Sequence, residues 1–198
     1  MSRPLLKFAQ VMDAISERFG ELSMYIVVIT VVIGFYNVVA RYTGRYTGVQ
    51  LSSNLFIELQ WYLYSLVFLF GFAYILKHGI NVRVDFIFAK WPKKRKATLD
   101  FWGHLFFLVP FCIMAIYVTI NPVLVSWGRL PNGGWGNWEL SPDPSGLPRA
   151  PIKTMIIVAF VLLLLQTFAE LIKLWYVMRG HEDLAVEELG GDAPLRIE

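Results

Sequence analysis

The sequence has little that would build a disulfide-bonded domain or a soluble enzyme. Its only cysteine is Cys112, which excludes a disulfide framework and any metal site made of several cysteines. Charged residues make up 17% of the 198 residues, whereas a soluble domain has about 25%. Hydrophobic residues make up 56%, which is too many for a disordered chain. The length also excludes a multidomain enzyme.

Recognisable catalytic motifs are missing as well. The chain contains no GxSxG, HExxH, CxxC or phosphate-binding loop pattern. It shows no inverted repeat of interrupted apolar segments, which is typical of transporters with a substrate site at the middle of the membrane. We therefore expect neither an enzyme nor a transporter that acts alone, and we expect no cofactor and no metal site.

Four long apolar runs are the main feature that is present. They lie at about 23–40, 59–76, 101–120 and 154–177. A helix needs about 20 apolar residues to cross about 30 Å of hydrocarbon, and all four runs reach that range. The helices of a soluble bundle, which is the alternative, would keep a polar face. The runs therefore predict an all-α integral membrane protein with four transmembrane helices in a domain of residues 23–178.

Residues 1–22 have a different pattern, in which apolar side chains recur every three or four positions. These side chains are Leu5, Phe8, Met12, Ile15, Phe19 and Leu22. Such spacing puts them on one side of a helix, with charged residues elsewhere. The pattern predicts an amphipathic N-terminal helix that lies in the membrane interface. The alternative is a helix that packs on a partner or on another copy of the chain.

The lysines and arginines indicate how the chain is oriented. If both termini lie on one side, that side carries thirteen of them and the other side carries five. Basic residues favour the cytoplasmic side, so we expect both termini in the cytoplasm. The run Lys93–Lys96 could bind nucleic acid, but beside a transmembrane helix it is more typical of contact with anionic lipid headgroups. We therefore expect membrane lipid, and no nucleic acid, as a partner.

The loop at about 121–153, before the fourth run, is rich in proline and glycine. Regular structure is unexpected there. The loop also carries Trp127, Trp135 and Trp138. Tryptophans at a membrane surface form an aromatic belt, and they also anchor protein interfaces. Both interpretations, an aromatic belt and an outward docking platform, remain open from the sequence.

Two groups of polar residues lie near the cytoplasmic ends of the third and fourth runs. Asp100 and His104 are one turn apart, and Gln166, Glu170 and Lys173 share one side of a helix. Antiparallel helices would bring the two groups to a similar depth. We expect a structural cluster or a subunit contact rather than a metal or catalytic site, which would need more ligands.

At the opposite side of the membrane, Arg41 ends the first run and Glu58 precedes the second. Glu58 shares a helical face with Trp61, Tyr62 and Ser65. An unpaired carboxylate at that depth is costly, so we predict an ion pair between Arg41 and Glu58. The alternative is that Glu58 faces a partner subunit while Arg41 reaches water.

Several short motifs together resemble the small membrane subunit (DctQ family) of tripartite ATP-independent periplasmic transporters. They are Arg41-Tyr42, Glu58-Leu59, the segment 79–85, Gly146-Leu147-Pro148 and Leu165-Gln166. Within 79–85, Asn81 stands where the family commonly has a histidine, and Arg83 and Asp85 follow it. The resemblance implies that Asn81, Arg83 and Asp85 make structural or partner contacts, with Asn81 limited to hydrogen bonding.

The resemblance further implies a role. The small subunit would be a fixed scaffold for a large, sodium-coupled membrane subunit that moves solute by an elevator motion. A periplasmic solute-binding protein would deliver the solute, often an organic acid. The location would be the bacterial inner membrane. Alternatives from the residues are a small redox or enzyme subunit that uses Asp100 and His104, and a self-assembling four-span channel. The acidic tail, residues 179–198, is expected to be solvated and mobile.

Overall fold

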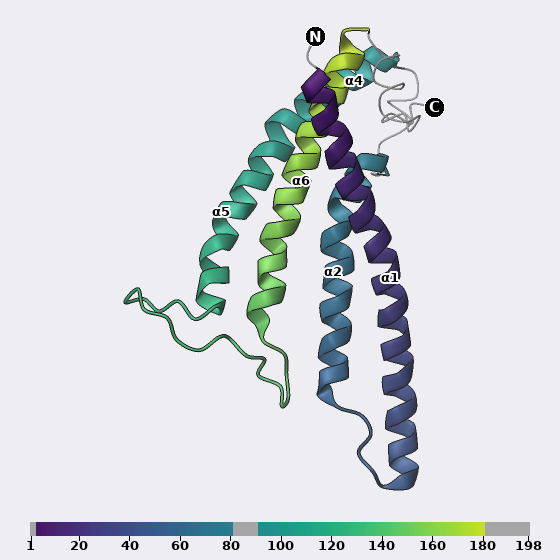
Figure 1. The fold of residues 1–198 in the computed structure, drawn as a ribbon, viewed down its shortest axis with the longest axis vertical. Coiled ribbons are helices and arrows are strands. Elements are labelled where there is room, and N and C mark those ends of the chain that lie inside the picture. The colour runs from purple at the N-terminus through teal and green to yellow at the C-terminus, as the bar shows by residue number, and fades with distance from the viewer. Residues whose placement is uncertain (1–2, 81–90, 181–198) are drawn as a thin grey trace. The chain divides into compact units, whose positions relative to one another are not determined.

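A computed structural model of the chain describes residues 3–80 and 91–180, which form four helical segments (Figure 1). α1 spans Arg3–Thr47 and α2 spans Asn54–His78. The third segment consists of α4 (Lys93–Gly103), the π-helical turn η1 (His104–Leu108) and α5 (Val109–Ser126), and the fourth is α6 (Arg149–Met178). In these described ranges the only β pairing is two isolated bridges, Arg129 with Trp135 and Leu140 with Pro148.

Each segment contains a helix that is long and apolar enough to cross a membrane. The four spans predicted from the apolar runs all lie inside these helices. The prediction of an all-α membrane protein with four transmembrane helices is therefore confirmed.

α1 is longer than a single crossing requires. Its 45 residues extend about 68 Å at 1.5 Å per residue, more than twice the hydrocarbon thickness. Pro4 lies in the first turn, where its missing amide hydrogen costs nothing, and no other proline follows before Thr47. The sequence therefore has nothing that would end a helix near residue 22. Residues 3–22 are helical, but they do not form a separate helix, because α1 continues directly into the first span.

The third segment widens at η1. The amide of Val109 donates to the carbonyl of His104, five residues earlier. Pro110 follows at once, and a proline has no amide hydrogen to donate and clashes with the carbonyl four residues before it. A π-helical turn relieves that clash by displacing the carbonyl, so the segment remains helical from Lys93 to Ser126.

The described residues belong to two compact units, and each of the four helical segments contributes to both. The described residues of the first unit lie within Met1–Phe19, Phe72–Ile116 and Ala159–Glu198, and the second unit comprises Gly20–Gly71 and Tyr117–Val158. The two units are described separately below.

In the first unit, the beginning of α1 lies beside the last turns of α6 (Figure 1). Leu6 packs against Tyr176 and Ile172. The side of α1 that is turned inward carries the buried residues Leu6, Ala9 and Ser16. The predicted apolar stripe is offset from that side by one residue, and its member Leu5 is 48% exposed. The N-terminal helix thus packs on its own chain, and its placement in the membrane interface stays a prediction.

Apolar side chains fill the rest of the first unit. Leu76 of α2, Cys112 of α5 and Leu163 of α6 form one buried cluster. Ala97 of α4 packs with Leu174 and Val177 of α6 in another. These clusters position the polar residues of α6 that the sequence singled out.

In the second unit, α1 and α2 pack closely against each other. A Cβ atom on Gly34 would lie 2.5 Å from the Nε2 atom of Gln60, so the two helices approach at a residue without a side chain. The rings of Tyr36 and Phe56 meet edge to face with centroids 5.1 Å apart. This packing fixes α2, which carries Glu58.

Candidate functional site

The third loop, residues 127–148, is held in place by a buried carboxylate on α2. Glu58 is 2% exposed. Its carboxylate accepts a hydrogen bond from the Ser141 hydroxyl and another from the Leu147 backbone amide. All three residues belong to the second unit, although more than 80 positions separate Glu58 from each of the two loop residues. Charge-assisted hydrogen bonds of this kind are stronger than neutral ones, so Glu58 anchors the loop to the helix.

Two neighbouring features complete the Glu58 anchor. The Tyr62 hydroxyl, one turn after Glu58, donates to the Pro148 carbonyl at 2.6 Å. A Cβ atom on Gly146 would lie 2.3 Å from the Cβ atom of Ser141, so this position has room only for glycine. The Gly146-Leu147-Pro148 motif and the Glu58-Leu59 motif, which are distant in the sequence, thus meet at one site.

A second contact ties the loop to the helices on either side of it. The Glu139 carboxylate accepts from the Ser126 hydroxyl at the end of α5 and from the Lys153 ammonium of α6. Lys153 also donates to the Ser126 hydroxyl at 2.7 Å. The hydrogen bonds from Lys153 and Ser126 hold the pKa of the Glu139 carboxyl below its ordinary value. Glu139 is therefore ionised at neutral pH and pairs with Lys153.

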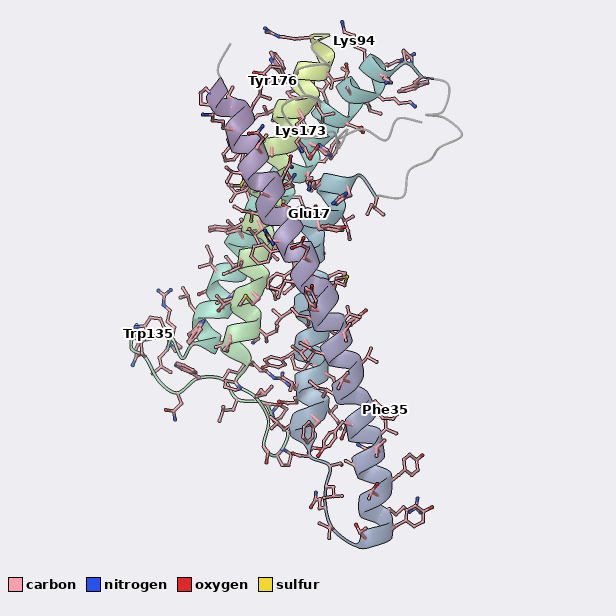
Figure 2. The ribbon with its side chains drawn as sticks, turned by 45° about the vertical axis from the view of Figure 1, so that its right-hand side comes forward. Glu17, Phe35, Lys94, Trp135, Lys173 and Tyr176 are labelled. Carbon is pink, nitrogen blue, oxygen red and sulfur yellow. The ribbon has the colours of Figure 1, made fainter. Side chains whose placement is uncertain are left out.

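The loop tryptophans divide into two kinds. The Trp127 indole donates to the Thr154 hydroxyl at 2.8 Å, and its ring meets that of Trp138 at 4.7 Å. Trp135 and Trp138 remain 64% and 51% exposed. Trp135 lies on the loop after α5 (Figure 2), where its backbone forms an isolated bridge with Arg129. One tryptophan therefore anchors the loop, whereas two present their rings outward.

The predicted ion pair between Arg41 and Glu58 is wrong for the described residues. Both carboxylate oxygens of Glu58 accept hydrogen bonds from the third loop, and Arg41 is exposed near the end of α1. The positive charge that acts on Glu58 comes from Arg149, which begins α6. Hydrogen-bond donors in the third loop offset the free-energy cost of burying the Glu58 carboxylate. The helical periodicity of the sequence could not predict these donors, because they lie outside the helices. Trp61 is 39% exposed on the next turn of α2.

The first unit holds a buried polar cluster of Gln166, Glu170 and Lys173 on α6, and the residues that contact it come from α1. The Lys173 ammonium lies 2.7 Å from both the Asp13 and the Glu170 carboxylates. Gln166 donates to Asp13 at 2.8 Å and accepts from the Ser16 hydroxyl at 2.7 Å. Figure 2 shows Lys173 on α6 beside α1. Every residue of this cluster thus has a partner from the same chain.

Sequence reasoning missed Asp13 and Ser16. A signal was present, because Asp13, Ser16 and Glu17 recur at three- and four-residue spacing and form a polar strip on a helix that carries an apolar stripe. Glu17 accepts from Lys77 at 2.5 Å and contacts His78 at 2.9 Å, which joins α1 to the end of α2. The strip therefore faces the chain's own helices.

The remaining predicted residues are placed as follows. Asp100 lies in α4, and His104 begins η1, one turn later. Asn81, Arg83 and Asp85 lie outside the described residues. Among the residues that the structure describes, no group of three or more His, Cys, Asp or Glu side chains could hold a metal ion.

Comparison with known proteins identifies a family. A family model described as "Tripartite ATP-independent periplasmic transporters, DctQ component" matches residues 30–176. The matched range contains the Glu58 anchor, the whole third loop and most of α6. No curated protein and no solved structure matches the chain.

Proposed function

The chain belongs to the DctQ family of tripartite ATP-independent periplasmic (TRAP) transporters, and on that premise we propose that it is the fixed scaffold for a large, sodium-coupled membrane subunit. Members of this family are components of transporters, so the family is not an enzyme family. The chain has four helices that are long and apolar enough to cross a membrane, and with its family this makes it a multi-pass protein of the bacterial inner membrane. In this proposal the large subunit carries an organic acid, which a periplasmic binding protein delivers.

The observation that carries the proposal is how the charged side chains are used. In the first unit, Asp13 and Glu17 on consecutive turns of α1 pair with Lys173 of α6 and Lys77 of α2. In the second unit, Glu58 holds the third loop. Charges that bind a moving ion or solute need open ligand positions, whereas these charges join one helix or loop to another. Such pairing supports a part of the transporter that stays rigid while another part moves.

We assign the third loop to the periplasmic side and both termini, with the run Lys93–Lys96, to the cytoplasm. The uneven distribution of basic residues supports this orientation. On the periplasmic side, a loop anchored by Glu58 and carrying exposed Trp135 and Trp138 offers a docking surface for the binding protein. Asn81, Arg83 and Asp85 are proposed as further partner or structural contacts.

The large subunit is proposed to contact the face of α2 that carries Trp61. Trp61 and Tyr64 are exposed there and line a pocket of about 350 Å³ together with Ile152 and Ile156 of α6. A pocket with aromatic walls is typical of the places where a partner's side chains are buried most tightly.

Co-purification tests the contact at Trp61. Trp61→Ala should reduce the amount of large subunit that co-purifies with this chain, because an exposed aromatic side chain that the contact would bury is lost. Phe35→Ala is the matched control, since Phe35 is an exposed aromatic residue on α1, 73% exposed. Equal losses from both variants, or no loss from Trp61→Ala, would place the contact elsewhere.

Solute uptake tests the function as a whole. Proteoliposomes that contain this chain alone should take up no organic acid under a sodium gradient. Addition of the large subunit and the binding protein should give uptake, and omission of this chain should abolish it. Sodium-driven uptake by this chain alone would refute the scaffold role.

A further inference from the structure

Two arginines at the end of α1 line a pocket that neither the family match nor the proposed function explains. Arg41 and Arg45 are one helical turn apart, which puts their Cβ atoms about 6 Å from each other. Both are exposed. They form one wall of a pocket of about 330 Å³, and residues 48–52 after the helix form the other.

The shape of the pocket depends on a close approach of the backbone to the helix. A Cβ atom on Gly44 would lie 2.5 Å from the Val49 carbonyl oxygen, so the chain after α1 folds back against this glycine. The turn is made at Gly48, whose φ is 71° and whose amide donates to the Gly44 carbonyl at 2.9 Å. The opposite wall is therefore fixed at a short distance from the two arginines.

The charge of the pocket is not balanced. Its lining contains no aspartate or glutamate, and Gln50 and Ser52 add only neutral polar groups. In the described ranges, neither guanidinium takes part in an ion pair or a side-chain hydrogen bond. The carboxylate that the sequence offered, Glu58, is occupied by the third loop. The negative end of the helix dipole accounts for a cation in the last turn, such as Arg45, but its effect does not extend as far as Arg41.

Two guanidinium groups at this spacing suit an oxyanion with several oxygens. Each guanidinium presents its donors in a planar fork that fits phosphate or carboxylate. The surroundings indicate which oxyanion the pocket would bind. Tyr42 and Tyr46 beside the arginines are 61% and 89% exposed, which is typical of the membrane–water interface.

Apolar side chains continue from this point along the helix. Phe35 is 73% exposed and projects outward from α1 (Figure 2), and Val38, almost one turn further on, is 55% exposed. With Tyr42, they form a stripe adjacent to the arginines. An amphiphile can therefore place its charged group in the pocket and its chains along this stripe.

We propose that the Arg41–Arg45 pocket binds the phosphate group of an anionic phospholipid, whose acyl chains lie along the exposed apolar side of α1. The site is independent of the solute that the transporter carries. It would hold this end of the first span at a fixed depth in the membrane.

Native mass spectrometry of the purified full chain, titrated with phosphatidylglycerol in detergent, tests the proposal. Arg41→Ala/Arg45→Ala should weaken phosphatidylglycerol binding at least tenfold. Gly44→Ala keeps both charges but forces the Val49 carbonyl away, and it should also weaken binding. Lys7→Ala/Arg129→Ala, which removes two positive charges from exposed positions elsewhere, is the matched control and should bind as the unchanged chain does.

Three competitors identify the occupant. Diacylglycerol, which lacks phosphate, should not displace phosphatidylglycerol, and glycerol phosphate, which lacks acyl chains, should do so only at far higher concentration. The large subunit should bind without releasing the lipid. The proposal is overturned if the arginine variant binds like the control, if diacylglycerol or glycerol phosphate competes equally, or if the large subunit displaces the lipid, which would assign the arginines to a carboxylate of that partner.

Discussion

Glu58 connects two motifs through a single carboxylate, so its replacement should act locally on the third loop. Glu58→Gln keeps one carbonyl oxygen but loses the charge and places an amide group against a hydrogen-bond donor. Hydrogen bonds to a charged acceptor contribute about 1.5–3 kcal/mol each. We expect the free energy of opening at the Leu147 amide to fall by about 2 kcal/mol, measured by hydrogen exchange.

Asp143→Asn is the control for Glu58→Gln. Asp143 lies in the same loop, its side chain is exposed, and the replacement makes the same change from acid to amide. Its effect on exchange at Leu147 should be close to zero. If the two variants have equal effects, the Glu58 anchor does not hold the loop.

Glu139 gives the loop a dependence on pH. The pKa of its carboxyl is lowered below the ordinary 4.5 by the Lys153 and Ser126 hydrogen bonds. Its contribution to stability is therefore fully present above pH 4.5 and is lost as the pH falls through the lowered folded-state pKa. The melting temperature of the unchanged chain should exceed that of Glu139→Gln at pH 6, and the difference should shrink below about pH 4. A difference that stays constant down to pH 3 would contradict the pairing.

At the scale of whole helices, the N-terminal part of α1 is attached to α6 through buried charges. Lys173 is 2% exposed and is the only cation within 3 Å of Asp13 or Glu170 among the described residues. Removal of one partner from a buried ion pair typically costs about 3–5 kcal/mol, because the remaining charge is left uncompensated. Lys173→Met should therefore lower the free energy of unfolding by about that amount, measured by chemical denaturation in detergent.

Two further variants make the Lys173 test specific. Lys94→Met removes an exposed lysine from α4 and should be nearly neutral. Asp13→Asn combined with Lys173→Met removes one of the two orphaned charges and should recover part of the loss. A failure of Asp13→Asn to recover any stability would mean that α1 and α6 are not coupled through this cluster.

Helical elements were predictable from the sequence because their signals are local. Each apolar run is long enough for a span, and the structure has a helix at each of them. The continuity of α1 could also have been predicted, since nothing between Pro4 and Thr47 ends a helix and Gly20 alone only weakens it. The contacts of the third loop were not predictable in this way. Ser141 and Leu147 reach Glu58 across more than 80 residues of sequence, and a loop without periodicity gives no register.

On the scale of the whole molecule, the charged residues link helices to one another through ion pairs, and this is the basis of the scaffold proposal. The polar residues of α6 were expected to meet residues of the third run, but the contacts that the structure gives Gln166 and Lys173 come from α1, a helix identified by its apolar residues. If these ion pairs between helices persist during transport, the helices of this chain do not move relative to one another within each unit. The absence of relative helix movement would distinguish a stationary subunit from one that moves during transport.

The most direct test replaces one ion pair between helices with a covalent cross-link. Cys112→Ser removes the only native cysteine, and Glu17→Cys/Lys77→Cys then places two thiols where α1 and α2 are joined by an ion pair of 2.5 Å. A short bifunctional thiol reagent should link them, and sodium-driven uptake by the assembled transporter should continue at nearly the uncross-linked rate. Loss of uptake on cross-linking, with recovery when a reducible linker is cleaved, would contradict the account, because it would show that these helices must move.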